Sequence, residues 1–180
     1  MSLPEGVERH TFGGRKRLAT RGEPVYGEPT DGEWRRWDPH RSKLGAMIER
    51  EMDVGLSGGE TVLYLGAAAG TTVSHVADFA GPTYAVEFAA RPARDLLEAA
   101  EQRPNCFPLL KDARRPETYA HVVEAGLDAV VQAVATRGQA RVAVPPGLFP
   151  RPAGPLPLAL QAPHEAVPAV PAGTLAAVPA

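Results

Sequence analysis

Between residues 61 and 134, short apolar runs alternate with segments whose apolar residues have helical spacing. Leu96 and Leu97 should both face inward from the second helix of this series. Alternating strands and helices are typical of α/β proteins with a parallel sheet, so this order constrains the fold more than any other feature. Strands are expected at residues 61–65, 83–87, 107–110 and 127–134, and helices at residues 72–79, 91–100 and 116–125.

The segment before residue 61 carries weaker signals. Residues 1–33 form short, turn-rich stretches, with possible strands at residues 17–20 and 24–27. A helix is expected to begin at Asp38-Pro39, because the apolar residues that follow have the spacing of one buried face. That face would consist of Leu44, Met47 and Ile48.

The last forty residues have a different composition from the rest of the chain. Residues 141–180 hold 10 of the 19 prolines and only three charged residues, Arg141, Arg151 and Glu165. Frequent prolines remove backbone donors and disfavour both helix interiors and central strands. We therefore expect the globular part to stop near Ala140, and residues 141–180, the tail, to be extended or disordered.

Charge, cysteine content and hydropathy exclude several classes of protein. A formal net charge of -2 excludes a globally basic nucleic-acid coat but leaves room for a local basic patch. A single cysteine excludes a disulfide framework and a cysteine-cluster zinc site. No run of about 18 apolar residues is present, and residues 1–10 lack the apolar core of a signal peptide. The expected location is the cytoplasm.

The stretch from Val62 to Thr72 leads from a buried strand through a small-residue turn into a helix. Small residues let a ligand approach the backbone, and a helix start offers free N–H groups. Glu87 ends the next strand, where a carboxylate can accept both hydroxyls of a ribose, and Asp112 follows the third strand, where an acid can meet an adenine amino group. These positions indicate a nucleoside cofactor, although both acids could instead be solvated strand ends. The turn lacks the G-x-G-x-x-G spacing of an NAD site, which favours S-adenosylmethionine.

Four segments resemble archaeal fibrillarin, the methyltransferase family of box C/D ribonucleoproteins: residues 24–45, 60–76, 83–97 and 111–116. The resemblance implies a Rossmann-like, S-adenosylmethionine-dependent methyltransferase sheet with a small N-terminal β subdomain. It implies three parts: residues 1–33 as the β subdomain, 34–140 as a partial methyltransferase domain, and 141–180 as the tail. The implied activity is 2′-O-methylation of ribose in rRNA and tRNA at positions chosen by a guide RNA. The implied partners are the box C/D guide RNA with its target RNA, a Nop5/Nop56-type scaffold and the kink-turn protein L7Ae.

The resemblance also implies roles for individual residues. Lys43 matches a lysine beside the active site, although by itself it could be a solvated helix lysine. His75 is interpreted as a packing or capping residue of its helix, because no second His or Cys has metal spacing. The implied cofactor contacts are Thr71 and Thr72 at the first loop, Glu87 and Phe88 at ribose and adenine, Asp112 and Ala113 at the adenine edge, and Val134 and Ala135 on the methionine side.

The chain departs from the family pattern near its end. Ala133 stands where the family carries an aspartate after the fourth strand, and the tail contains no lysine to match a later family lysine. Either the tail is genuine and Pro-rich, or residues beyond about Arg141 are read out of frame, which we favour. In both cases the sheet would lack about three strands, the fourth strand would keep an unpaired edge, and the protein would be marginally stable. An alternative function is therefore a fibrillarin-like binding subunit that transfers no methyl group, and a weaker one is a small-molecule methyltransferase.

Local basic and aromatic residues are candidates for RNA contact. Residues 34–37 and Arg41 group cations with aromatic rings, which suits phosphate contact and stacking. Arg114 and Arg115 lie next to Asp112 at the expected cofactor rim. Each of these arginines could equally be an ion-paired surface residue.

Overall fold

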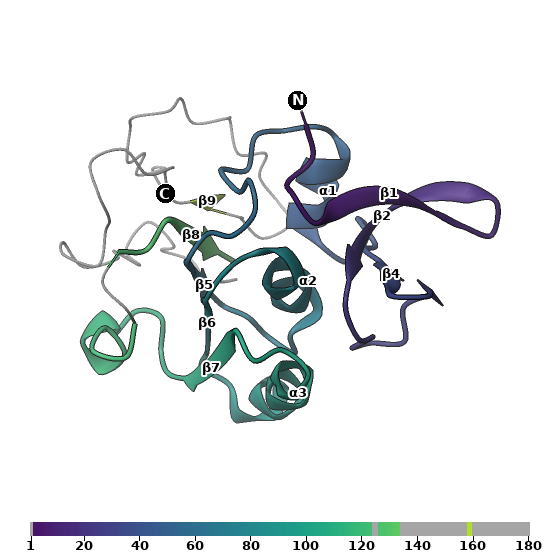
Figure 1. The fold of residues 1–180 in the computed structure, drawn as a ribbon. Helices are drawn as coiled ribbons and strands as arrows, with labels where there is room; N and C mark the ends of the chain where they lie inside the picture. Colours follow the sequence, from purple (N-terminus) through teal and green to yellow (C-terminus); the bar gives the residue numbers. More distant parts are fainter. Residues whose placement is uncertain (1, 124–125, 134–157, 160–180) are drawn as a thin grey trace.

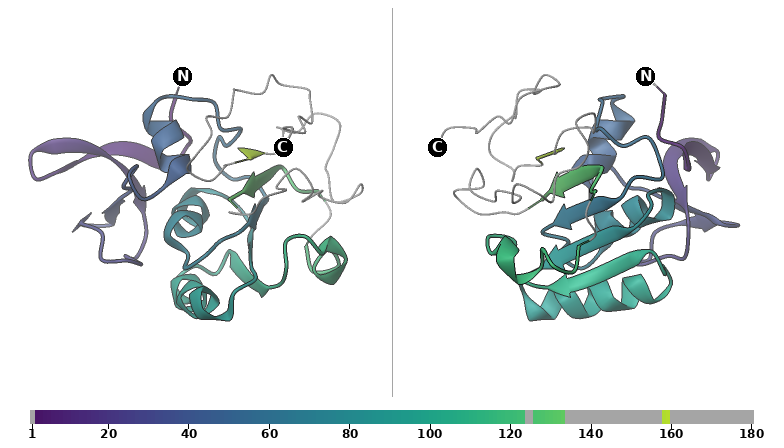
Figure 2. Two further views of the ribbon diagram at one scale, coloured as in Figure 1. Left: turned by 180° about the vertical axis from the view of Figure 1, so that it is seen from behind. Right: turned by 60° about the vertical axis from the view of Figure 1, so that its left-hand side comes forward.

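A computed structural model describes residues 2–123, 126–133 and 158–159 of the chain (Figure 1). They form a four-stranded antiparallel sheet and a five-stranded parallel sheet. Figures 1 and 2 show helices α2 (Thr71–Phe79) and α3 (Ala90–Glu101) on one face of the parallel sheet, with the antiparallel sheet beyond α2. The predicted α/β class and the N-terminal β subdomain are confirmed.

The antiparallel sheet has the strand order β1-β2-β4-β3. A hairpin of β1 (Val7–Phe12) and β2 (Arg15–Arg21) forms half of it, and β2 also pairs with β4 (Trp34–Arg36), whose other neighbour is β3 (Thr30–Asp31). The expected strand at residues 17–20 lies within β2. The expected strand at residues 24–27 is wrong, because these residues form bends.

The parallel sheet has the order β7-β6-β5-β8-β9. The strands β5, β6, β7 and β8 each lie within two residues of the predicted starts, and β6 matches the prediction at both ends. Helix α1 begins five residues later than predicted, where the Ser42 hydroxyl accepts a hydrogen bond from the Gly45 N–H at 3.0 Å. The bounds are α1 Lys43–Glu49, β5 Val62–Leu65, β6 Thr83–Glu87, β7 Cys106–Leu110, β8 Ala129–Gln132 and β9 Leu158–Ala159.

Alternate residues of β5 enter two separate cores, as expected for a strand buried on both faces. Val62 and Tyr64 pack with α2, α1 and the antiparallel sheet, while Leu63 and Leu65 pack on the opposite face. The first core also contains Trp37, which is fully buried. This first core is therefore continuous from the parallel sheet to the antiparallel sheet.

Three sequence predictions need correction. Within the described part of the predicted helix, residues 116–123, a 3₁₀ turn forms at Pro116–Thr118 and is followed by turns and a bend. Leu97 is 55% exposed, since only Leu96 of the two faces the sheet. The end of β8 is paired rather than free, because β9 lies parallel to it with Val131 opposite Leu158.

Apart from β9, the tail lies outside the described residues. Its extended or disordered state therefore stays a prediction. Within the described part of the chain, no helix is long and apolar enough to cross a membrane.

Candidate cofactor site at the carboxyl edge of the parallel sheet

The loop from Gly66 to Gly70 joins β5 to α2 at the carboxyl edge of the sheet. The N–H groups of Gly66 and Ala67 both donate to the Val86 carbonyl, at 2.9 and 3.0 Å, which ties the loop to β6. Gly70 has φ +90°, and a Cβ there would lie 3.1 Å from the Ala99 Cβ, so glycine allows α2 and α3 to pack closely. Gly70 caps α2 without a side chain, which leaves the first-turn N–H groups of Thr71 and Thr72 uncapped by it.

Glu87 ends β6 and joins two loops through its carboxylate. Its Oε2 accepts the Ala68 N–H at 2.8 Å, and its Oε1 accepts the Ala89 N–H at 2.8 Å. Ala68 takes a left-handed conformation, φ +48°, to present its N–H. A carboxylate has about four acceptor positions, so two remain after these bonds. The side chain is thus held in place while it can still accept two hydroxyl groups.

Beside Glu87, the edge carries an exposed ring and a second acid. Phe88 is 67% exposed. The Lys111 N–H donates to the Glu87 carbonyl at 3.1 Å, so Asp112 follows β7 directly next to the end of β6. Ala113 is buried, and the Tyr119 hydroxyl donates to its carbonyl at 2.9 Å. The structure therefore brings Thr71, Thr72, Glu87, Phe88, Asp112 and Ala113 to one edge of the sheet, as the sequence predicts.

The remaining residues considered for the site lie elsewhere in the structure or outside its described part. Ala133 follows β8, and its N–H donates to the Leu65 carbonyl at 2.8 Å, so it lies beside the end of β5. Val134 and Ala135 lie outside the described residues. Lys43 begins α1 with an exposed side chain. Its catalytic role stays a prediction.

Two of the residues proposed for RNA contact are buried instead. Arg35 and Trp37 both have no exposed surface. The Arg35 guanidinium donates to Glu28, to Asp78 at 2.7 Å and to the Ser74 hydroxyl at 2.9 Å. Sequence reading could not identify this role, because the acidic partners are 7 and 43 residues away.

Arg35 belongs to a buried cluster that links the two sheets. Asp78 of α2 accepts hydrogen bonds from Arg35 through Oδ2 and from Arg103 through Oδ1, the latter at 2.9 Å. Arg103 also donates to the Glu23 carbonyl at 2.6 Å. Burial by itself would raise the pKa of Glu28, but backbone N–H groups and the Arg35 guanidinium hold that pKa below its usual range. We call Glu28, Arg35, Asp78 and Arg103 the interface cluster.

The other proposed RNA contacts are partly engaged by neighbours. Arg41 is exposed and stacks over the Tyr26 ring at 4.6 Å. Arg114 pairs with Asp112 and Arg115 pairs with Glu117, so both are ion-paired surface arginines. None of these contacts indicates RNA directly.

His75 is a packing residue, as the sequence predicts. It is fully buried and stacks on Trp37, with ring centroids 4.8 Å apart. Among the described residues, no group of three or more His, Cys, Asp or Glu side chains is arranged to hold a metal ion.

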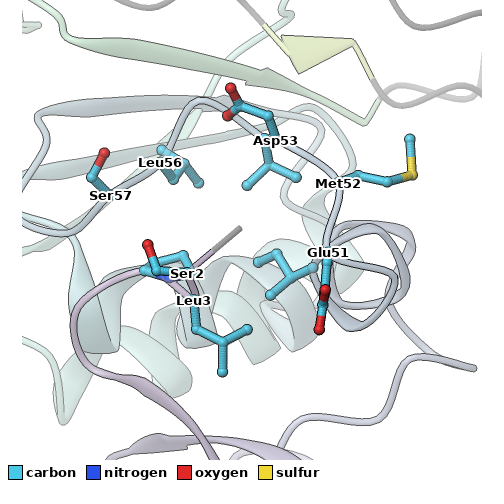
Figure 3. Close-up of a pocket in the computed structure, with 10 residues that line it drawn as sticks. Ser2, Leu3, Glu51, Met52, Asp53, Leu56 and Ser57 are labelled. Carbon is cyan, nitrogen blue, oxygen red and sulfur yellow. The ribbon is translucent and has the colours of Figure 1, made fainter.

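A pocket with a volume of about 240 Å³ lies away from the predicted site (Figure 3). Residues 2–4, Ile48 and side chains of the segment 51–57 line it. None of the predicted cofactor residues is among them, so this pocket does not belong to the carboxyl edge.

Comparison with known proteins agrees with this architecture. A family model for fibrillarin matches residues 8–171, which extends past the predicted boundary at residue 140. A fibrillarin-like rRNA/tRNA 2′-O-methyltransferase of Haloarcula marismortui is 78% identical over 143 residues, covering 79% of this chain and 68% of the relative. The corresponding protein of Halorubrum lacusprofundi is 69% identical over 166 residues, covering 92% and 78%.

Two solved structures are also similar. One is a fibrillarin/Nop5p complex, with a TM-score of 0.75 and 37% identity, covering 87% of this chain and 75% of that one. The other is Aeropyrum pernix fibrillarin with natively bound S-adenosyl-L-methionine, with a TM-score of 0.73 and 37% identity, covering 87% and 74%. On the family match and these identities, the chain belongs to the fibrillarin family.

Proposed function

We propose that this chain is an S-adenosylmethionine-dependent methyltransferase that modifies ribose 2′-hydroxyls of rRNA and tRNA. The observation that carries the proposal is the clustering of a small-residue loop, Glu87 and Asp112 at one sheet edge, the place where α/β folds bind nucleotides. The names of the relatives and the bound ligand of the Aeropyrum pernix protein support the same activity and cofactor.

The residues at the edge fit the parts of this cofactor. Glu87 keeps two acceptor positions for the two ribose hydroxyls, and the exposed Phe88 ring offers a stacking surface for adenine. Asp112 and Ala113 would meet the adenine edge, Thr71 and Thr72 the first loop, and Val134 and Ala135 the methionine side. Bound S-adenosylmethionine would supply a methyl group activated by its sulfonium: the bond from sulfur to the methyl would break as the bond to the ribose 2′ oxygen forms, leaving S-adenosylhomocysteine and a released hydroxyl proton.

We assign to Lys43 the orientation of the 2′-hydroxyl and help in removing its proton, since it is the family-matched lysine in the chain. An alkyl side chain at Ala133 cannot accept a proton, so Lys43 would act without a carboxylate at the end of β8. Selection of the target ribose would fall to a box C/D guide RNA, with a Nop5-type scaffold and L7Ae in the same particle. The Nop5p complex of a structural relative supports the scaffold.

Titration with S-adenosylmethionine and a methylation assay with reconstituted guide RNA, scaffold and target test the proposal together. Glu87→Gln keeps the shape of the side chain but replaces one acceptor oxygen with a donor. We expect it to weaken cofactor binding about tenfold or more, because a hydrogen bond to a charged group is lost. Glu98→Gln, on the exposed face of α3, is the matched control and should bind normally. Equal affinities of the two variants would contradict the assignment of Glu87.

Ala133 favours a second candidate function, a subunit that binds cofactor and scaffold but transfers no methyl group. Ala133→Asp would place a carboxylate beside the end of β5, where the family has one. If the missing acid limits the reaction, this variant should gain about 10²-fold or more in methylation rate, the usual contribution of a general acid–base group. Ala133→Asn has the same size without the charge and should gain nothing. A wild-type chain that already methylates at the rate of Ala133→Asp would rule out the second candidate.

A further inference from the structure

Both oxygens of the Asp112 carboxylate are engaged by a single neighbour, Arg114. Oδ1 accepts the Arg114 backbone N–H at 2.9 Å and Nε at 2.9 Å. Oδ2 accepts Nη2 at 2.7 Å and Nε at 3.2 Å. These four contacts come from three N–H groups, because the single Nε hydrogen is shared between the two oxygens, and together they engage both oxygens of the carboxylate.

Glu87, on the neighbouring strand, has a different arrangement. Its carboxylate accepts hydrogen bonds from two backbone N–H groups, and these bonds can stay in place when a ligand binds. Two acceptor positions of the carboxylate remain available. The Arg114 guanidinium lies along both oxygens of Asp112, so a ligand donor there competes with it for the carboxylate. The two acids of the edge therefore differ before a ligand binds. Glu87 has acceptor positions available, whereas the Asp112 carboxylate is engaged by Arg114.

The contact on Asp112 can open at little cost. The Arg114 side chain is 61% exposed, against 17% for Asp112, so water can solvate the guanidinium as soon as it leaves. Exposed ion pairs contribute little because solvent screens them. The Arg114 backbone N–H remains on Oδ1 when the side chain moves, so Asp112 keeps its orientation.

We propose that Arg114 sets the cofactor affinity of this site by competing with the adenine amino group for the carboxylate of Asp112. The inference rests on the proposed function, which places adenine at Asp112. When adenine binds, its exocyclic amine replaces the guanidinium as the donor to Asp112. The free energy needed to open the ion pair reduces the net affinity that this new hydrogen bond contributes. Arg115 does not compete for the same oxygens, because its guanidinium donates to Glu117 at 3.0 Å and its effect on Asp112 is the longer-range one of its charge.

The test compares Arg114→Ala with Arg115→Ala in the full chain. Both arginines are exposed, at 61% and 67% of their side chains, so both variants should fold, and Arg115→Ala is the matched control. The probes are S-adenosylmethionine, adenosine and purine riboside, which is adenosine without the exocyclic amine. Arg114→Ala should bind S-adenosylmethionine and adenosine about two- to fivefold more tightly than the wild type, and purine riboside with unchanged affinity. Arg115→Ala should leave all three dissociation constants unchanged.

Each contrary result has its own meaning. Unchanged or weaker adenosine binding by Arg114→Ala, with cofactor binding intact in the wild type, would overturn the competition and leave the proposed function standing. An equal gain for adenosine and purine riboside would also overturn it, because the amine would then not be the competitor. If the wild type binds none of the three ligands, both the inference and the proposed function fail.

Discussion

At the scale of single residues, the hydrogen bonds around His75 define the tautomer of its neutral ring. The Thr20 hydroxyl lies 2.6 Å from Asp78 Oδ2 and 2.7 Å from His75 Nδ1. Its one proton goes to the carboxylate, so Nδ1 carries a hydrogen and donates to Thr20. Nε2 then accepts from the Tyr26 hydroxyl at 2.9 Å. The Tyr26 hydroxyl also lies 3.4 Å from the Arg36 carbonyl, so the neutral state rests on burial and on the positive charges of Arg35 and Arg103, which disfavour a second proton on the ring.

This neutral state predicts a loss of stability in mild acid. Burial and then the positive charges of Arg35 and Arg103 hold the pKa of His75 well below its usual value. In the unfolded chain, His75 takes up a proton below about pH 6.5, whereas in the folded chain it stays neutral. The free energy of unfolding therefore falls as the pH drops below that value. Between pH 7.5 and 5.5 the wild type should lose more unfolding free energy than His75→Gln, by up to about 1.4 kcal/mol, the limit for a ring that stays neutral in the folded protein.

Urea denaturation at the two pH values measures this difference. Other titrating groups, including His10, are present in both proteins and cancel. His40→Gln changes an exposed position and is the control. Its loss of unfolding free energy between the two pH values should equal that of the wild type. Parallel pH dependence of the wild type and His75→Gln would mean that His75 takes up a proton as readily in the folded protein as in the unfolded chain, which would contradict the prediction.

At the scale of elements, α1 is positioned by a glycine that faces a tryptophan. A Cβ on Gly45 would lie 2.8 Å from Nε1 of Trp37, which is fully buried. Helix propensity by itself would favour alanine over glycine by about 1 kcal/mol. The contact with a buried indole opposes this gain, since overpacking costs about 1–3 kcal/mol.

Gly45→Ala should therefore destabilise the protein on balance, by up to about 2 kcal/mol. A double-mutant cycle with Trp37→Phe measures the coupling, because phenylalanine removes the indole nitrogen that the new methyl group would meet. We expect the Gly45→Ala change to cost less in the Trp37→Phe background. A stabilising Gly45→Ala variant would mean that α1 shifts freely and that the indole does not position it.

The same elements show which parts of the fold the sequence could predict. The strands β5, β6 and β8 are apolar runs buried on both faces, and such runs can be recognised without knowing their neighbours. Strand β1 gives no such signal, because the residues after Val7 are mostly polar or half-exposed. The helix expected at 116–125 is replaced by turns around Tyr119, whose ring is fully buried and whose hydroxyl bonds to Ala113. This tertiary contact has no counterpart in local propensity.

The candidate site divides in the same way. Glu87 and Asp112 could be placed at one edge from strand order, since parallel strands end on the same side. The engagement of Asp112 by Arg114 depends on side-chain geometry and could not be predicted. Arg35 and Trp37 were misassigned for a related reason: a cation next to aromatic residues has the same sequence pattern whether its acidic partners lie in solvent or in the core.

At the scale of the whole molecule, the two sheets share one apolar core and the interface cluster. Trp37 and Leu18 from the N-terminal part pack with Val73 and Val76 of α2. Asp78 adds two buried ion pairs, to Arg35 of β4 and to Arg103 after α3. Neither sheet can separate without exposing this core and leaving buried charges unpaired, so both sheets should unfold in one transition.

Two spectroscopic signals can follow the two sheets separately during urea unfolding. Both tryptophans of the chain, Trp34 and Trp37, lie in or next to β4, so fluorescence reports on the antiparallel sheet and its contact with α2. Helical circular dichroism reports mainly on α2 and α3. The two transitions should coincide in the wild type, as a cooperative two-state unfolding requires.

Asp78→Asn should lower the midpoint of both transitions, because it leaves Arg35 and Arg103 without a full countercharge in a buried site. Breaking a buried pair costs about 3–5 kcal/mol, and the loss should register in both signals since the cluster belongs to both sheets. Asp95→Asn, on the exposed face of α3, is the control and should change stability by less than about 0.5 kcal/mol. A fluorescence transition that moves to lower urea while circular dichroism stays unchanged would mean that the antiparallel sheet unfolds by itself and that the cluster does not couple it to the cofactor edge.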